Sequence, residues 1–215
     1  MNDINILIDY VENNLLPNID MKSVRHFDPI VVNNVPESWK LLGVGNYAAV
    51  LVHIDFPQYA IKIYAEGRCG IEEEIKAYNK INDHPSFSRC FYSSEKYLIL
   101  KRLEGKTLYN CINEGIHIPE SVIKDIDEAL EYSKSLGLNP NDVHAKNVMI
   151  VKGRGIVADI SDFTKIKKCS LWEDFKKAYY KIYIPLLQKK HPPIPEFYLN
   201  MVRRSYRLFR ILFKK

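Results

Sequence analysis

The stretch WKLLGVGNYAAVLVHI, residues 39–54, contains two runs of apolar and β-branched residues on either side of GVGN. Short runs of this kind, bounded by Gly and Asn, are typical of β-strands joined by a tight turn. A helix directly after the glycines would indicate a dinucleotide-binding fold. The second run, YAAVLVHI, instead predicts a second strand, so this part of the chain is expected to form a glycine-containing β-hairpin.

The hairpin glycines match a phosphate-binding pattern. Gly43, Gly45 and Val50 fit G-x-G-x-x-G-x-V, with Ala48 in place of the third glycine. Because glycine has no side chain, backbone N–H groups at such positions can approach phosphate oxygens closely. A G-x-G pair alone also occurs in ordinary hairpins, but a strand on each side favours a lid over nucleotide phosphates.

A third strand is predicted over residues 58–64 and carries Lys62 between two isoleucines. Alternation along a strand points Lys62 to one face and its neighbours to the other. An isolated lysine in such a strand is most often a surface residue whose stem packs on apolar groups. The second interpretation, which the glycine hairpin favours, is a lysine that holds the α- and β-phosphates of a nucleotide.

A helix predicted over residues 68–82 offers a partner for Lys62. Glu74 falls on the apolar face of this helix, whereas Glu72 falls on the polar face. An unpaired buried carboxylate is costly, so we expect Glu74 to pair with Lys62. The apolar face is made by Ile71, Ile75, Tyr78 and Ile81.

Residues 97–103, YLILKRL, predict another strand, which in a nucleotide-binding protein would meet the adenine. Extended backbone at Lys101 and Leu103 would then bond to the base, and Leu100 would border its pocket. This is a weaker expectation, because every strand offers backbone donors and acceptors.

The loop NPNDVHAKNVMI, residues 139–150, places Asn147 five positions after Asp142 and runs into an apolar segment. Asn, Pro and Asp are ordinary turn formers, which gives one interpretation. The other is phosphoryl transfer, in which an Asp meets the acceptor hydroxyl and an Asn holds a metal ion. A second carboxylate, Asp159, ends the predicted strand at residues 155–159 and is a candidate Mg²⁺ ligand, with Asp162 as its rival.

The order of elements predicts an α+β fold in two lobes. A helix over residues 3–16 and an irregular lead-in over 17–36 precede the β-rich part. After residue 103 the chain is mostly helical, with helices expected at 118–138, 171–188 and 195–213. Two short strands, at 148–151 and 155–159, are expected between the first two of these helices. We therefore divide the chain into residues 1–37, 38–103 and 104–215.

Composition excludes several classes of protein. The 215 residues are 47% hydrophobic, which is enough for a packed core. No apolar run approaches the roughly 18 residues that a membrane span needs, and the first residues are acidic rather than basic, unlike a signal peptide. The four cysteines form no CxxC pair, so we expect no zinc site or disulfide framework, and reduced thiols in a cytoplasmic protein.

Charge is unevenly distributed. The chain has a net charge of +5, but residues 165–215 hold 14 Lys/Arg against three acidic residues and carry +11. Contact of the last helix with nucleic acid or an anionic membrane is one interpretation. A terminal helix packed on the domain with its basic side in water is the other, and it is our expectation. The basic side is made by Arg203, Arg204, Arg207 and Arg210.

Taken in order, these elements resemble the protein-kinase-like superfamily over about residues 38–165. The resemblance rests on GVGNYAAV, AIK, Glu74 on a helix, YLILKRLEG, DVHAKN and VADIS. It implies a β-rich N-lobe, a short, mostly helical C-lobe, and the use of ATP and Mg²⁺. Gly43, Gly45, Ala48, Val50, Leu100, Lys101 and Leu103 would then line the ATP site.

The same resemblance implies catalytic and metal-binding roles. Lys62 would hold the α- and β-phosphates and pair with Glu74, and Asp142 would orient the acceptor hydroxyl as catalytic base. Asn147 and Asp159 would hold magnesium, and His144 would contact the γ-phosphate.

Departures from the family pattern limit what the resemblance implies. Pro140 and Asn141 replace the His-Arg of the catalytic loop, His144 replaces its Lys, and no A-P-E segment follows. The D-x-H-x-x-N loop is similar to aminoglycoside-phosphotransferase and RIO-like branches. The implied function is an ATP-dependent kinase, with a serine/threonine-protein kinase placed ahead of a small-molecule kinase and of a nucleotide-binding pseudokinase; the acceptor, protein or small molecule, is not identified.

Overall fold

A computed structural model describes residues 3–23, 28–167 and 169–213, with side chains described as far as Tyr206. The fold is mixed α/β, with a strand-rich part before residue 102 and mostly helices after it, and it is compatible with the two-lobed expectation. The chain forms two compact units. One comprises residues 1–104, 129–141 and 160–168, and the other comprises residues 105–128, 142–159 and 169–215.

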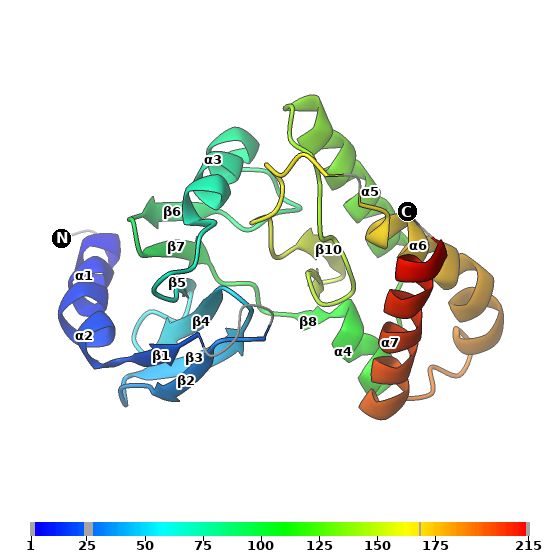
Figure 1. Cartoon of the computed structure of the whole chain (residues 1–215), viewed down its shortest axis with the longest axis horizontal. Helices are drawn as coiled ribbons and strands as arrows, with labels where there is room; N and C mark the ends of the chain where they lie inside the picture. The colour runs from blue at the N-terminus through cyan, green and yellow to red at the C-terminus, as the bar shows by residue number, and fades with distance from the viewer. Residues whose placement is uncertain (1–2, 24–27, 168, 214–215) are drawn as a thin grey trace. The chain divides into compact units, whose positions relative to one another are not determined.

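The first unit is built on an antiparallel sheet of five strands (Figure 1). The predicted hairpin and third strand are present, and the predicted strand at 97–103 is shorter by two residues. A fifth strand next to it was not predicted. In sheet order the strands are β3 (Trp39–Val44), β4 (Ala48–His53), β5 (Tyr59–Tyr64), β7 (Tyr97–Lys101) and β6 (Cys90–Ser93).

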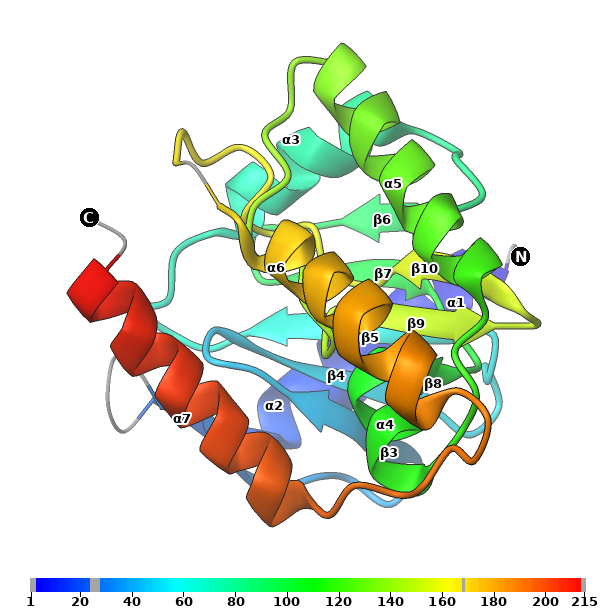
Figure 2. The same cartoon turned by 90° about the vertical axis from the view of Figure 1, so that its right-hand side faces the viewer.

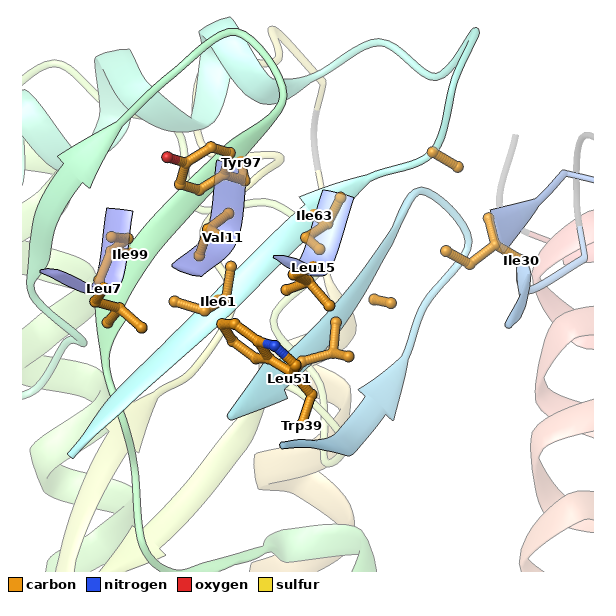
Figure 3. Close-up of a cluster of buried hydrophobic side chains, with 12 residues drawn as sticks. Leu7, Val11, Leu15, Ile30, Trp39, Leu51, Ile61, Ile63, Tyr97 and Ile99 are labelled. Carbon is orange, nitrogen blue, oxygen red and sulfur yellow. The ribbon is translucent and has the colours of Figure 1, made fainter. Parts of the chain in front are cut away.

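The N-terminal helical segment packs on one face of this sheet (Figure 3). It runs through α1 (Asp3–Tyr10), the π-helical η1 (Val11–Leu15) and α2 (Leu16–Asn18). Leu7, Val11 and Leu15 recur every four residues, lie on one side of the helix and are fully buried. They share a core with Ile61 and Ile63 of β5. Alternation along β5 therefore directs Lys62 and Tyr64 to the opposite face of the sheet.

The irregular lead-in expected for residues 17–36 is wrong in part. Strands β1 (Asp20–Lys22) and β2 (Val31–Asn34) form a short antiparallel pair. Helix α3 (Ile71–Ile81) begins three residues later than predicted, after Gly70, whose φ of 120° is a conformation that glycine adopts without strain.

The second unit contains a three-stranded sheet in the order β10-β9-β8. Strands β9 (Val148–Val151) and β10 (Arg154–Val157) follow the loop that holds Asp142, as predicted. Strand β8 (Lys106–Thr107) and helix α4 (Leu108–Glu114) were not predicted. Helix α5 (Glu120–Ser135) contributes to both units.

Three helical segments complete the second unit: α6 (Leu171–Ala178), the π-helical η2 (Tyr179–Leu187) and α7 (Glu196–Phe213) (Figure 2). They lie where the sequence predicts two helices. As expected, α7 contacts its unit, through Tyr206 and Glu196, and its Arg203 and Arg204 are exposed. Four apolar residues of the helix are also exposed, which was not expected: Phe197, Tyr198, Met201 and Val202. The side chains of Arg207 and Arg210 lie outside the described residues. None of the described helices is both long and apolar enough to cross a membrane.

Candidate active site

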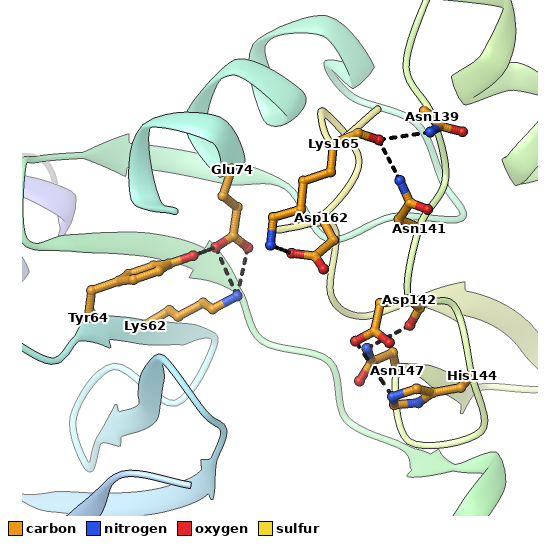
Figure 4. Close-up of polar contacts among 10 residues, drawn as sticks. All are labelled: Lys62, Tyr64, Glu74, Asn139, Asn141, Asp142, His144, Asn147, Asp162 and Lys165. Carbon is orange, nitrogen blue, oxygen red and sulfur yellow. Dashed lines mark hydrogen bonds and ion pairs between the residues drawn. The ribbon is translucent and has the colours of Figure 1, made fainter. Parts of the chain in front are cut away.

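A buried ion pair joins strand β5 to helix α3 (Figure 4). Lys62 Nζ lies 2.9 Å from Oε1 and 2.8 Å from Oε2 of Glu74. Glu74 has no solvent exposure and Lys62 is 8% exposed. Burial of two opposite charges is tolerated when their geometry is good and further donors satisfy the carboxylate. The pairing predicted from helical periodicity is therefore present.

Tyr64 provides such a donor. Its hydroxyl donates a hydrogen bond to Glu74 Oε2. Tyr64 follows Lys62 by two residues, so both side chains project from the same face of β5 towards the same carboxylate. Sequence reasoning missed Tyr64, because its two-residue spacing from Lys62 gives only a shared face of the strand and not its hydrogen bond to Glu74.

The glycine hairpin closes with a backbone hydrogen bond of 2.9 Å from the Gly45 N–H to the Ala48 carbonyl. Gly43 pairs with Val50 across the hairpin. Neither glycine has a positive φ. A Cβ atom at Gly43 would meet nothing within 4 Å, and one at Gly45 would make only an ordinary contact of 3.6 Å. Within the described structure, neither backbone conformation nor packing requires glycine at these two positions.

The backbone of the strand end after Leu100 is partly used inside the unit. The Lys101 N–H donates to the Arg89 carbonyl at 2.7 Å, and the Lys101 carbonyl accepts from Ser88 Oγ at 2.8 Å. The Leu103 N–H has no partner among the described residues. Leu100 itself is buried. Of the two backbone donors considered for adenine, only that of Leu103 is open.

In the second unit, the loop after residue 141 is held by its own side chains. Asp142 has a φ of 56°, in a left-handed region that Asp tolerates better than most residues. Asn147 Nδ2 donates to the Asp142 carbonyl at 3.0 Å. His144 Nε2 lies 3.7 Å from Asp142 Oδ2, and His144 Nδ1 accepts from the Lys146 N–H at 3.2 Å. These contacts bring together Asp142, His144 and Asn147 (Figure 4).

Asp159 lies at the same end of the β9–β10 hairpin as Asn147. The Ala158 N–H donates to the Asn147 carbonyl at 2.9 Å, and Asp159 follows directly. Because Nδ2 of Asn147 is engaged by Asp142, its Oδ1 is the atom suited to a cation. Among the described residues, no three His, Cys, Asp or Glu side chains cluster as a metal site by themselves.

Asp162 has a different environment, in the first unit. It forms an ion pair of 2.5 Å with Lys165, and the next residue, Phe163, is fully buried and packs edge-on against Phe87. Asn139 and Asn141 each donate from Nδ2 to the Lys165 carbonyl, at 2.8 and 2.6 Å. The two asparagines, which the sequence marks only as turn formers, therefore fix the segment after Asp159.

A clamp from helix α5 holds the hairpin that carries Asn147 and Asp159. The Asp125 carboxylate accepts from Arg154 Nε and Nη2, the latter at 2.7 Å, and from the Gly155 N–H at 2.8 Å. Burial opposes ionisation of Asp125, but the hydrogen bonds from Arg154 and Gly155 and the guanidinium charge outweigh it and lower the pKa of the carboxyl. Gly155 is required here, since a Cβ would lie 2.6 Å from the Val122 carbonyl.

The predicted site residues thus fall into two groups. The first unit brings Lys62 of β5 next to Glu74 of α3. Its sheet also carries Gly43, Ala48, Val50, Leu100 and Lys101, with Gly45 in the hairpin turn and Leu103 just after β7. The second unit brings together Asp142, His144, Asn147 and Asp159.

No protein-family model matches the chain. The chain is similar to a protein of Bacillus subtilis (strain 168) named "Putative serine/threonine-protein kinase YrzF", with 28% identity over 180 residues that cover 82% of each chain. This similarity, over most of both chains, supports a kinase-like function.

Proposed function

We propose that the protein is an ATP- and Mg²⁺-dependent phosphotransferase that moves the γ-phosphate of ATP to a hydroxyl. The observation that carries the proposal is the buried Lys62–Glu74 pair, on the sheet that bears the glycine hairpin. A lysine fixed by a buried carboxylate on that sheet is a preorganised phosphate ligand. The similarity to the Bacillus protein supports the same reaction class.

The residues present fit a nucleotide. A Cβ at Gly43 would meet nothing and one at Gly45 would make only an ordinary contact, so the hairpin backbone leaves room for phosphate oxygens to approach it. The Leu103 N–H is available to an adenine nitrogen, and the Lys101 carbonyl retains one of its two lone pairs. Leu100 would form the apolar border of the base.

The residues also fit magnesium. Mg²⁺ prefers oxygen ligands and is usually held by one or two carboxylates together with substrate phosphates. Asn147 Oδ1 and the Asp159 carboxylate would supply the protein oxygens, and bound Mg²⁺ would neutralise phosphate charge. We assign this role to Asp159 rather than Asp162, because Asp159 directly follows Ala158, whose N–H is bonded to the Asn147 carbonyl.

In this mechanism Asp142 orients the acceptor hydroxyl and accepts its proton. Its carbonyl bond to Asn147 fixes the backbone that carries the carboxylate. Because Nδ1 of His144 accepts a backbone N–H, a neutral imidazole carries its proton on Nε2, on the side of Asp142. That N–H is a weaker stabiliser of transferred phosphate charge than a lysine ammonium would be.

For the acceptor, we propose a serine or threonine hydroxyl of a protein. The name of the Bacillus relative favours this class over a small molecule. The sequence after Asp162 holds no A-P-E segment, so we expect recognition of a folded surface rather than of an extended peptide.

Nucleotide binding tests the proposal. The purified chain should unfold at a higher temperature with Mg²⁺ and ATP than without them. Lys62→Ala removes the phosphate ligand, so the increment due to ATP should vanish even if the variant has a lower starting temperature. An unchanged unfolding temperature for the wild-type chain at saturating Mg²⁺ and ATP would contradict the proposal.

A further inference from the structure

Helix α7 exposes an apolar strip to solvent. Phe197, Tyr198, Met201 and Val202 are 72%, 53%, 49% and 62% exposed. Phe197 and Met201 are four residues apart, as are Tyr198 and Val202, so the four side chains lie on adjoining rows of one side of the helix. Large apolar side chains grouped on a surface indicate a contact partner.

The helix is held to its unit by a different side. The Tyr206 hydroxyl donates to Asp174 Oδ2 at 2.6 Å, and the Tyr109 hydroxyl donates to Glu196 at 3.2 Å. Leu199 and Asn200 are partly buried. The apolar strip therefore remains exposed while α7 is attached to α6 and α4.

Positive charge borders the strip. Arg203 and Arg204 are exposed. Arg204 lies three residues after Met201 and borders the strip, whereas Arg203 lies on the side of the helix that bears Glu196. Residues 165–215 as a whole carry a net charge of +11, whereas residues 1–164 carry −6. The apolar strip thus belongs to the basic part of the chain.

We infer that α7 docks on an anionic phospholipid surface, lying in the interface with its apolar strip inserted among the acyl chains. An amphipathic helix with apolar and aromatic residues on one side, a bordering arginine in Arg204 and a basic surrounding sequence is suited to such a surface. Double-stranded nucleic acid would match the charge but offers no apolar layer for Phe197 and Met201. A second copy of the chain would bring two basic helices together. Lipid headgroups and acyl chains match both features of α7.

Sedimentation of the whole chain with vesicles tests this inference. The chain should bind vesicles of phosphatidylcholine and phosphatidylglycerol in equal parts, and should bind pure phosphatidylcholine much more weakly. Raising the salt concentration should weaken binding, because it screens the headgroup charge. Phe197→Ser with Met201→Ser should weaken binding by about tenfold or more, and Arg203→Ala with Arg204→Ala should do so by about tenfold.

Matched control variants distinguish binding through α7 from non-specific hydrophobic or electrostatic binding to vesicles. Ile54 is an exposed apolar residue on the turn after β4, and Ile54→Ser should leave vesicle binding nearly unchanged. Lys189→Ala with Lys190→Ala removes the same charge from exposed positions outside α7 and should weaken binding much less than the arginine pair. All variants should retain the unfolding temperature of the wild-type chain.

Four results would overturn the inference. The first is failure of the chain to bind the mixed vesicles, and the second is an equal loss of vesicle binding in the lysine and arginine double variants. The third is self-association that Phe197→Ser abolishes, without any vesicle binding. The fourth is tight binding to double-stranded DNA that is unchanged by Phe197→Ser but depends on Arg203 and Arg204. Since α7 contains none of the proposed catalytic residues, these results are independent of the phosphotransferase activity.

Discussion

The Lys62 ammonium lies within 2.9 Å of both carboxylate oxygens of Glu74, a side chain that has no contact with solvent. Removing one partner is strongly destabilising, because the charge that remains is buried without its counter-charge. Lys62→Met and Glu74→Gln should each lower the free energy of unfolding by about 3–5 kcal/mol. The double variant should lose less than the sum, by about 0.5–3 kcal/mol. Urea unfolding of the four proteins measures this coupling, and strictly additive losses would show that the pair is not coupled.

The hairpin glycines should be needed for ATP and not for folding. Because a Cβ at Gly43 meets nothing, Gly43→Ala should leave stability unchanged or raise it by up to about 1 kcal/mol, yet raise the KM for ATP. Gly155→Ala is a control for the effect on folding, since its Cβ would meet the Val122 carbonyl at 2.6 Å. Its free energy of unfolding should fall by about 1–3 kcal/mol. Urea unfolding measures the effect on stability, and ATP titrations measure the effect on KM. A Gly43→Ala variant with the wild-type KM for ATP would show that the hairpin is not part of the ATP site.

Asp159 and Asp162 should differ in their response to magnesium. Asp159→Asn should lower turnover by about a hundredfold or more and raise the Mg²⁺ concentration needed for half-maximal rate. Asp162→Asn should disturb only the ion pair with Lys165 and keep the Mg²⁺ requirement of the wild-type chain. Turnover measured over a series of Mg²⁺ concentrations tests this. If Asp162→Asn raised the Mg²⁺ requirement and Asp159→Asn did not, Asp162 would be the magnesium ligand.

Asp125 should make the second unit sensitive to acid. Its pKa in the folded chain lies below the ordinary value of 3.8, so its stabilising effect is present above that value and is lost as the pH falls through the lowered pKa. Asp125→Asn should lose about 1–3 kcal/mol at neutral pH, and its difference from the wild-type chain should shrink below pH 3.8. Urea unfolding at several pH values tests this, with Glu131→Gln, at an exposed carboxylate on the same helix, as a control. A difference that stays constant through the acid range would contradict the assignment.

Parts of the site could be predicted because their residues stand at positions that the helix or strand spacing of the sequence identifies. Glu74 stands out as a charge on the apolar face of α3, and the fold places it against Lys62 as expected. The strands from residue 39 to 64 are long enough to alternate. Tyr64 was missed because an aromatic residue in a strand is ordinary, and only the three-dimensional position of Glu74 shows what its hydroxyl does.

Other parts were missed because they are short or are held by tertiary contacts. Strand β8 has two residues and pairs with β9 from far along the chain. Helix α4 did have a sequence signal that went unused, since Thr107 caps its first turn and Gly115 ends it with a φ of 70°. The bonds from Asn139 and Asn141 to Lys165 join segments over 20 residues apart, which no local pattern reveals.

Asp142 is the proposed catalytic base, so replacing its carboxylate tests whether the loop takes part in phosphoryl transfer. The purified chain and its Asp142→Asn variant are given ATP and Mg²⁺ with a mixed protein acceptor, and ADP release and label on protein are followed. We expect turnover or labelling by the wild-type chain and a loss of rate of about a hundredfold or more in the variant, with ATP binding retained. Equal rates in the two proteins, or no turnover by a wild-type chain that binds Mg²⁺ and ATP, would rule out this role for Asp142.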